Sequence, residues 1–129
     1  MNKSNRLAIF GAVLYILWGL LHFMAAYAVF KLAQSTDSMV HGRLVQAAWN
    51  LACFSVAAIG IAVFFNLKNS LWGYWVNVAI ISVADLGFIF FVLVPGLMPL
   101  WPGALGPVLW LVGLALSTAG IMQRASRAV

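Results

Sequence analysis

Two ionisable side chains, Asp85 and His22, stand within apolar stretches of a sequence that has only two acidic residues. An ionisable group is costly to place in an apolar environment, so each of these positions is a candidate for function. A carboxylate and an imidazole held side by side can pass a proton between them and act as general acid and general base. We therefore take Asp85 and His22 as the candidate catalytic residues.

A second set of polar residues follows the spacing of a helix. The set consists of Arg43, Gln46, Asn50 and Cys53, which recur at intervals of three and four residues. Residues at these intervals share one helix face, so their side chains form a continuous stripe. The amides of Gln46 and Asn50 can orient a substrate oxygen or a water molecule through hydrogen bonds. The stripe is therefore expected to contribute to a binding site.

Aromatic residues share a face with His22 by the same spacing rule. Tyr15, Trp18 and His22 are separated by three and four residues. If this face and the polar stripe converge on Asp85, they enclose a pocket that opens outward, with an aromatic floor and a polar upper wall. The expected ligand-binding residues are Asn50, Gln46, Arg43, Trp18, Tyr15 and Trp49.

A purely structural role for the same residues is the main alternative. A buried aspartate is often satisfied by a His or Asn from a neighbouring helix, and such a pair can simply join the two helices. Polar bonds between membrane helices contribute only about 0.6 kcal/mol on average, so stability alone is a weak reason to place Asp85 there. The sequence leaves both roles open for Asp85, His22 and Asn50.

The elements that position these residues follow from the composition. The 129 residues are 65% hydrophobic and 7% charged, and the mean hydropathy is +1.05. About a quarter of the residues in a water-soluble domain are charged, because charge keeps its surface in water. The natural solvent of this chain is therefore lipid. The length predicts a single domain over residues 1–129, since two domains would each lack an adequate core.

Four apolar segments are long enough to cross a bilayer as helices. A hydrocarbon core of about 30 Å needs about 20 apolar residues at helical rise. The predicted spans are residues 7–30, 44–65, 71–94 and 105–122. Asn69 or Ser70 can cap the third span, and several Pro and Gly residues interrupt the chain before the fourth. The predicted fold is an all-α integral membrane bundle of four transmembrane helices.

The distribution of cations predicts that both ends of the chain face the cytoplasm. Five cations flank one side of the predicted spans, namely Lys3, Arg6, Lys68, Arg124 and Arg127. Only Lys31 and Arg43 lie on the other side, and the side richer in Lys and Arg is normally cytoplasmic. In this N-in, C-in orientation, Asp85, His22 and Asn50 all lie about 8–12 Å below the outer surface. The expected location is the inner membrane of a bacterium.

The first span also has features of a secretory signal sequence. Cations precede its apolar run, and residues 26–28 have the A-x-A pattern of a cleavage site. The run is longer than the roughly 7–15 residues usual for a signal sequence, and it contains Trp18 and His22. We therefore expect a retained transmembrane helix.

Several classes of partner and cofactor fit the sequence poorly. The seven cations are scattered, whereas nucleic-acid binding needs them clustered on one face. His22 and His41 lie at different predicted depths, which disfavours a haem between them, and with Asp85 they match no helical zinc motif. Cys53 is the only cysteine, so the sequence offers neither an intrachain disulfide nor a CxxC pair. No cofactor, metal or nucleic acid is expected.

Three functions are consistent with these features. The favoured one is a pocket that binds a lipophilic small molecule from the membrane and converts it by acid–base chemistry, as an isomerase, lyase or hydrolase. The second is a proton-coupled transporter acting as a homodimer, because four helices barely enclose a path. The third is a non-catalytic membrane subunit of a larger complex. The pocket ranks first because few polar residues, among them Asn77, Ser55 and Ser117, continue toward the inner side.

Overall fold

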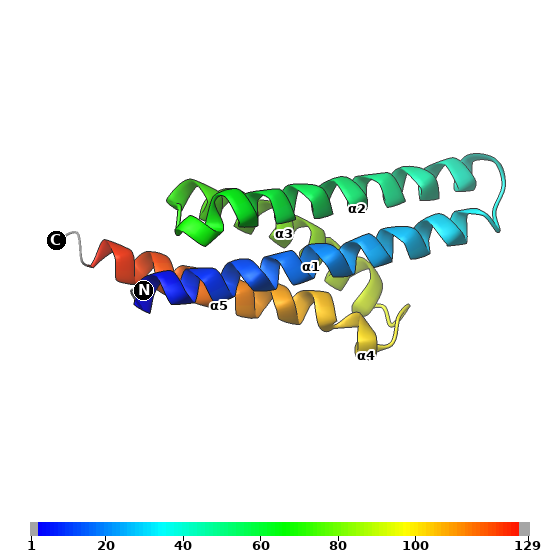
Figure 1. The fold of residues 1–129 in the computed structure, drawn as a ribbon. Helices are drawn as coiled ribbons and strands as arrows, with labels where there is room; N and C mark the ends of the chain where they lie inside the picture. Colours follow the sequence, from blue (N-terminus) through cyan, green and yellow to red (C-terminus); the bar gives the residue numbers. More distant parts are fainter. Residues whose placement is uncertain (1–2, 127–129) are drawn as a thin grey trace.

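The computed structural model describes residues 3–126 and consists of helices and their connections (Figure 1). The long α-helices are α1 (Lys3–Ala33), α2 (Ser38–Phe64), α3 (Leu71–Phe88) and α5 (Leu105–Ala125). The shorter elements are a 3-10 turn, η1 (Asn66–Lys68), a π-helical turn, η2 (Ile89–Leu93), and α4 (Leu100–Gly103). No strand occurs in this part of the chain, so the all-α prediction is confirmed.

Four helices are long and apolar enough to cross a membrane, which confirms the predicted four-helix membrane bundle. The observed spans are Arg6–Ala33, Ser38–Lys68, Leu71–Leu93 and Leu105–Ala125. The first two exceed the predicted residues 7–30 and 44–65, because polar residues expected in the connecting loop continue the helices instead. The 31 residues of α1 extend about 46 Å, so the α1–α2 hairpin is longer than a hydrocarbon core of about 30 Å.

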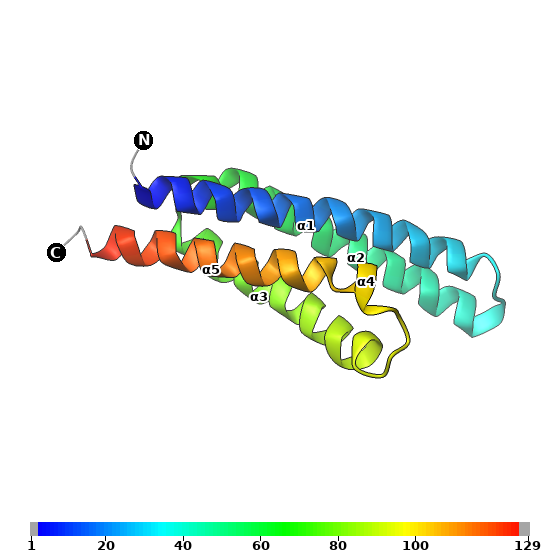
Figure 2. The ribbon, with the colours of Figure 1, turned by 90° about the horizontal axis from the view of Figure 1, so that it is seen from below.

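Helix α1 runs through the middle of the bundle and packs against both α2 and α5 (Figures 1 and 2). Glycines let the backbones approach closely. A Cβ atom added to Gly19 would lie 2.5 Å from the Ile59 side chain of α2, and one added to Gly11 would overlap Ser117 of α5. Close packing of this kind drives helix association in membranes, because lipid removes the hydrophobic driving force. As a result, Trp18 and Tyr15 on this face of α1 are completely buried.

The hydrogen-bond pattern of α3 changes just beyond Asp85. The backbone N–H of Val94 donates to the carbonyl oxygen of Ile89, five residues back, at 2.8 Å. The predicted span over residues 71–94 is therefore an α-helix only as far as Phe88 and continues as the π-helical turn η2. Figure 2 shows this end of the span turning away from the α1–α2 hairpin. Such turns are frequent at functional sites, because the extra residue changes where the neighbouring side chains point.

Asparagine side chains hold the connection between α2 and α3. Asn69 adopts the left-handed conformation with φ 54°, and its side chain donates to the Gly120 carbonyl oxygen of α5 at 3.2 Å. The surrounding carbonyl groups orient the Asn66 amide so that its nitrogen donates to Gly73 at 3.0 Å. The Ser70 side chain accepts from the N–H of Gly73 and caps α3, as one of the two predicted caps.

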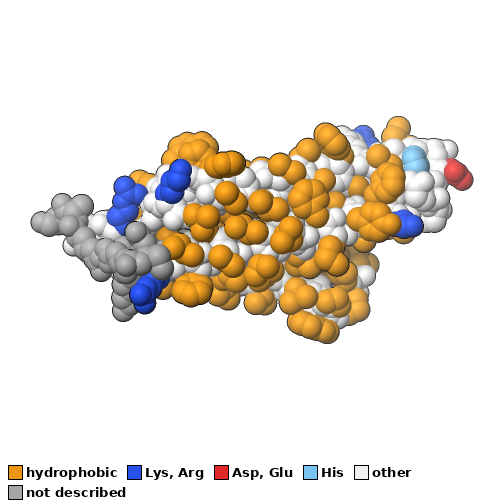
Figure 3. Space-filling view, in the orientation of Figure 1, with side chains coloured by type: hydrophobic (Ala, Val, Ile, Leu, Met, Phe, Trp, Pro, Cys, Tyr) orange, Lys and Arg blue, Asp and Glu red, His pale blue; other side chains and the backbone are white. Residues whose placement is uncertain are grey.

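The start of α1 and the end of α5 lie at the same end of the bundle (Figure 1). Figure 3 shows Lys and Arg side chains at both ends and an apolar surface between them, as expected for a body surrounded by lipid. Of the five cations predicted to be cytoplasmic, the structure describes the side chains of Arg6, Lys68 and Arg124. The Lys3 side chain and Arg127 lie outside the described part of the chain.

Candidate functional site

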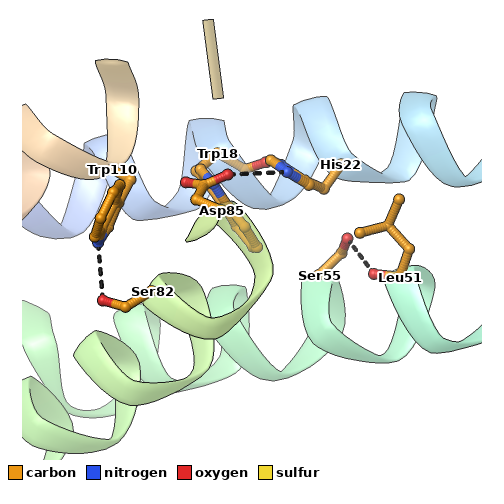
Figure 4. A network of polar contacts seen from close by, with 7 residues as sticks. All are labelled: Trp18, His22, Leu51, Ser55, Ser82, Asp85 and Trp110. Carbon is orange, nitrogen blue, oxygen red and sulfur yellow. Dashed lines mark hydrogen bonds and ion pairs between the residues drawn. The ribbon is translucent and has the colours of Figure 1, made fainter. Parts of the chain in front are cut away.

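Asp85 of α3 faces two residues of α1 in the interior of the bundle (Figure 4). Its Oδ2 atom accepts a hydrogen bond from Trp18 Nε1 at 2.8 Å. Its Oδ1 atom lies 3.6 Å from His22 Nε2 and has no hydrogen-bond partner among the described residues. The Asp85 side chain is completely buried, and that of His22 is 11% exposed. The structure therefore brings together Asp85, His22 and Trp18, three of the residues singled out from the sequence.

The hydrogen bonds of His22 define which ring nitrogen carries a hydrogen. Nδ1 lies 2.8 Å from the backbone oxygen of Trp18, which can only accept, so Nδ1 must donate. In a neutral ring Nε2 is then an acceptor, and it faces Oδ1 of Asp85. Two acceptors repel unless a proton lies between them. A proton on either atom would remove this repulsion, and the separation of 3.6 Å is longer than a hydrogen bond.

The indole ring of Trp18 supports both partners of this pair. It stacks on the His22 ring with a centroid separation of 3.7 Å and an interplanar angle of 24°. An aromatic face stabilises a protonated imidazole by cation–π attraction, and the indole N–H stabilises an ionised Asp85. Helical geometry places both α1 side chains on one face, because His22 follows Trp18 by four residues. One indole therefore stabilises the charge-separated form of the pair on both sides.

Gly106, in the first turn of α5, forms a third side of the site. A Cβ atom added there would lie 3.0 Å from His22 Cε1 and 3.4 Å from Asp85 Oδ1. Only a residue without a side chain lets the α5 backbone approach so closely, so Gly106 sets the room available to the pair. Sequence patterns do not predict Gly106 as part of the site, because its proximity to the pair depends on how α5 packs. The signal in the sequence was a Gly-Pro pair at the start of the last span.

A second polar contact lies on the neighbouring turn of α3. The indole Nε1 of Trp110, on α5, donates to Ser82 Oγ at 3.0 Å (Figure 4). Ser82 precedes Asp85 by three residues, so both side chains project from the same side of α3. Each of these α3 residues thus meets an indole from a different helix. The Ser82 contact is a complete hydrogen bond between neutral groups and holds α3 against α5.

Further buried polar atoms lack partners on the side of the site nearer the chain ends. Within the described residues these include the Tyr15 hydroxyl, Asn77 Oδ1 and the Ser117 hydroxyl. Tyr15 packs on Gly113, four residues before Ser117 on α5. Ser117 also lines a small cavity of about 10 Å³, close to the space one water molecule needs, with Asn66 and other residues near the chain ends. Unpaired polar atoms therefore continue from the Asp85 region toward that end.

The remaining predicted binding residues lie elsewhere. Arg43, Gln46, Asn50 and Trp49 are all exposed on α2. Arg43 donates to the side-chain oxygen of Gln46 at 3.0 Å, and no hydrogen bond within the described residues joins any of the four to Asp85. The expected convergence of the polar stripe on Asp85 is therefore absent, because α2 packs on α1 through its opposite face. Tyr15, by contrast, is buried on the same face of α1 as Trp18 and His22.

Asn50 instead lines a groove that is separate from the His22–Asp85 pair. The groove has a volume of about 490 Å³ and is lined by Asn50, Cys53, Phe54, Ala57 and Ile80. Ile80 belongs to α3 and the other four residues belong to α2, so the groove lies between these two helices. It is mainly apolar, with Asn50 as its one strongly polar side chain.

The arrangement of the pair allows proton exchange more readily than metal binding. Within residues 3–126 no three His, Cys, Asp or Glu side chains are grouped as metal ligands would be. Proton movement between Nε2 and Oδ1 requires only that the two atoms approach, since they are 3.6 Å apart. Access from outside is through His22, because Asp85 is completely buried.

No protein-family model, curated protein or solved structure matches this chain.

Proposed function

We propose that the protein is a proton-coupled transporter of small molecules, and that the His22–Asp85 pair is its proton-binding site. The single observation that carries this proposal is the unpaired Oδ1 atom of Asp85, which is buried and faces His22 Nε2 at 3.6 Å. A buried polar group with a purely structural role normally has its hydrogen bonds complete. Asp85 Oδ1 has no donor and faces a second acceptor, His22 Nε2, so this position is suited to gaining and losing a proton.

The polar atoms between the pair and the chain ends support a route for that proton. Tyr15 lies one helical turn from Trp18 on α1, and Ser117 faces the same side of α1 from α5. Hydroxyl groups can both donate and accept, so they pass a proton along when water molecules bridge them. The sequence predicts too few polar residues for such a path and a ligand-binding role for Tyr15. The buried Tyr15 hydroxyl, which lies beside Ser117, makes the transporter hypothesis stronger than it is from the sequence.

The acid–base conversion of a lipophilic molecule has weaker support. Both ring nitrogens of His22 face groups of the protein, Nδ1 toward Trp18 and Nε2 toward Asp85. A substrate would meet a free ring nitrogen only after one of these contacts had opened. The small exposure of the His22 side chain still favours a lipophilic ligand as the second candidate, because the imidazole edge is the one part of the pair that a molecule in the membrane can reach.

We also propose the orientation N-in, C-in, in the inner membrane of a bacterium. It places the end of the bundle that carries Arg6, Lys68 and Arg124 in the cytoplasm, in agreement with the excess of cations there. The unpaired polar atoms then continue from the proton site toward the cytoplasmic side.

The first experiment measures proton binding by infrared difference spectroscopy during a pH titration in lipid nanodiscs. The chain has only two acidic side chains, Asp85 and the exposed Asp37, so single substitutions can assign a protonated-carboxyl band. The band is expected to persist in Asp37→Asn and to vanish in Asp85→Asn. If no Asp85 band forms at any pH at which the protein stays folded, the proton site is disproved.

The second experiment measures transport in proteoliposomes that contain a pH-sensitive dye. A pH gradient is imposed, and a panel of amphipathic amines and other lipophilic molecules is added one at a time. At least one compound is expected to dissipate the gradient in the wild type and in Asp37→Asn but not in Asp85→Asn. Equal fluxes in all three proteins contradict transport. A molecule that co-purifies with the wild type and is lost from Asp85→Asn, without proton flux, would instead support the ligand-binding function.

A further inference from the structure

The outward face of α2 has a spacing pattern that internal packing does not explain. Its residues alternate at intervals of three and four over six positions, namely Arg43, Gln46, Asn50, Cys53, Ala57 and Gly60. We call this set the α2 seam. An unbroken three–four alternation is the pattern by which two helices pack side by side with a left-handed crossing. Within the bundle, however, α2 uses a different face.

The face that α2 turns toward α1 lies opposite the seam. The buried residues of α2 are Ala48, Ser55, Ala58 and Ala62. Each is two positions from a seam residue, for example Ala48 from Asn50, and two positions correspond to about 200° around a helix. The first four seam residues are exposed, and Ala57 and Gly60 are half-buried. The seam therefore makes no close contact with α1, and its middle part borders the groove whose other wall is Ile80 of α3.

The polarity of the seam indicates what covers it. Asn50 is exposed, lies inside the second predicted span and forms no hydrogen bond with any described residue. An amide facing hydrocarbon has no water to bond to and needs a protein partner at the same depth. A primary amide is self-complementary, because it both donates and accepts. A second copy of this chain supplies the matching amide at the matching depth.

The deeper half of the seam has the shape needed for such a partner. Cys53, Ala57 and Gly60 are small, and small residues let two membrane helices approach closely. A Cβ atom added to Gly60 would meet nothing within 4 Å, so there is open space beside this position. The groove of about 490 Å³ lined by Asn50, Cys53 and Ala57 can accept side chains of the partner.

We infer that the protein forms a symmetric homodimer in which the α2 seam packs on its own copy, with Asn50 bonded to the partner's Asn50. A two-fold axis along the membrane normal makes the two helices parallel, so every seam residue lies near its equivalent. A buried Asn in such a seam fixes a parallel pair in one register. Arg43 lies at the end of the seam next to the connection between α1 and α2, where water can hydrate its charge. This inference is independent of the proton site.

Cys53 provides the test, because it is the only cysteine and lies within the seam. Membranes containing the full-length protein at low density are oxidised with copper phenanthroline and analysed on non-reducing gels. The dimer predicts a disulfide-linked species of twice the 14.0 kDa chain. The matched control is Cys53→Ser combined with Val112→Cys, which moves the thiol to an exposed position on α5. The control is expected to cross-link at least tenfold less.

Two substitutions test the geometry of the seam. Gly60→Leu fills the space reserved for the partner helix and is expected to abolish the Cys53 cross-link, whereas Ala115→Leu on the exposed face of α5 leaves it unchanged. Asn50→Val is expected to weaken the dimer by about threefold to thirtyfold, the range for one polar bond between membrane helices. Infrared detection of the Asp85 carboxyl reports whether these variants remain folded around the proton site.

Each alternative occupant of the seam gives a different result. Equal cross-linking of Cys53 and the Val112→Cys control means random collision and overturns the dimer. A Cys53 adduct with a protein of different mass, or a monomer in native mass spectrometry that carries a lipid lost on Gly60→Leu, overturns it as well. A dimer that persists in Gly60→Leu shows that another face makes the contact and contradicts the seam.

Discussion

Two polar clusters in this bundle differ in how completely their hydrogen bonds are formed. At the chain-end turn, the Asn69 side chain donates to the Gly120 carbonyl oxygen, and the backbone carbonyl oxygen of Asn69 accepts from Arg124. In the middle of the bundle, Asp85 has one complete hydrogen bond, from Trp18, and one oxygen without a partner. Both residues are buried, so burial does not separate them. The difference lies in the open acceptor, which the asparagine turn lacks.

The two clusters are therefore expected to have different roles, one in stability and one in function. A complete network lowers the energy of one conformation only, and its residues therefore act on stability. An incomplete network has a position that a proton can fill, so its residues are expected to act on function and to contribute less to stability. Four substitutions test this distinction, in order of decreasing expected effect on the free energy of unfolding.

The largest effect is expected for Asn69→Leu. This change removes the hydrogen bond to Gly120 and places a bulky side chain at φ 54°, a conformation that Leu adopts poorly. We expect a loss of about 2–4 kcal/mol, measured by steric trapping in bicelles. The Asp85 carboxyl band should remain unchanged. Asn69→Gly tolerates the backbone angle, so it should recover part of the loss. An altered carboxyl band in either variant would remove the proposed separation of the two clusters.

The next effect distinguishes Asp85→Ala from Asp85→Asn. Asn keeps an oxygen that accepts from the Trp18 indole, whereas Ala leaves that buried N–H without a partner. Asp85→Ala should therefore be less stable than Asp85→Asn by about 1–3 kcal/mol in the same unfolding assay. Neither variant retains the carboxyl band. Equal stabilities would show that the Trp18 hydrogen bond contributes nothing to the fold.

Gly106→Ala is expected to disturb the pair without changing its charge. The added methyl group would lie 3.0 Å from His22 Cε1, so the imidazole must shift away from α5. Overpacking of this kind costs about 1–3 kcal/mol, and we expect the lower end because the His22 ring is partly exposed. The carboxyl band should shift in frequency. Gly87→Ala, on α3 with no atom within 4 Å of the added methyl, is the control and should leave the band in place.

The smallest effect is expected for Ser82→Ala. It removes the hydrogen bond between Trp110 and Ser82, which is complete and neutral and does not involve the pair. The expected loss is about 0.6 kcal/mol, the average for polar bonds between membrane helices. Proton binding by Asp85 should not change. If it does, Ser82 belongs to the proton site, and the polar network is larger than the His22–Asp85 pair.

Helical spacing alone was enough to predict which residues of α1 share a face. Tyr15, Trp18 and His22 share a buried face of α1, because residues three and four apart always share a side of a helix. The same rule grouped Arg43, Gln46 and Asn50 correctly on one face of α2. It does not say which neighbour that face meets, and here it faces away from α1. The rule therefore identified both faces but could not pair them.

The contacts that α5 makes with the site could not be predicted from sequence patterns, for a related reason. Gly106 and Trp110 are far along the chain from Asp85, and their contacts depend on how α5 packs against α1 and α3. Glycine is frequent in membrane helices, so its presence does not mark a site. The surroundings of the buried Tyr15 hydroxyl are likewise not readable from the sequence, because they depend on how α5 packs on α1.

The lipid solvent, the number of spans and the residues that share a helix face can all be predicted from the amino-acid sequence. These follow from local quantities, namely the run length of apolar residues, the position of polar turns and the period of the helix. The packing of the helices, by contrast, sets the contact of Asp85 with His22 and Trp18 and leaves one Asp85 oxygen without a partner. It also leaves Arg43, Gln46 and Asn50 of α2 exposed. The physical reason is that helix pairing in a membrane depends on close packing at small residues, such as Gly11 and Gly19 of α1.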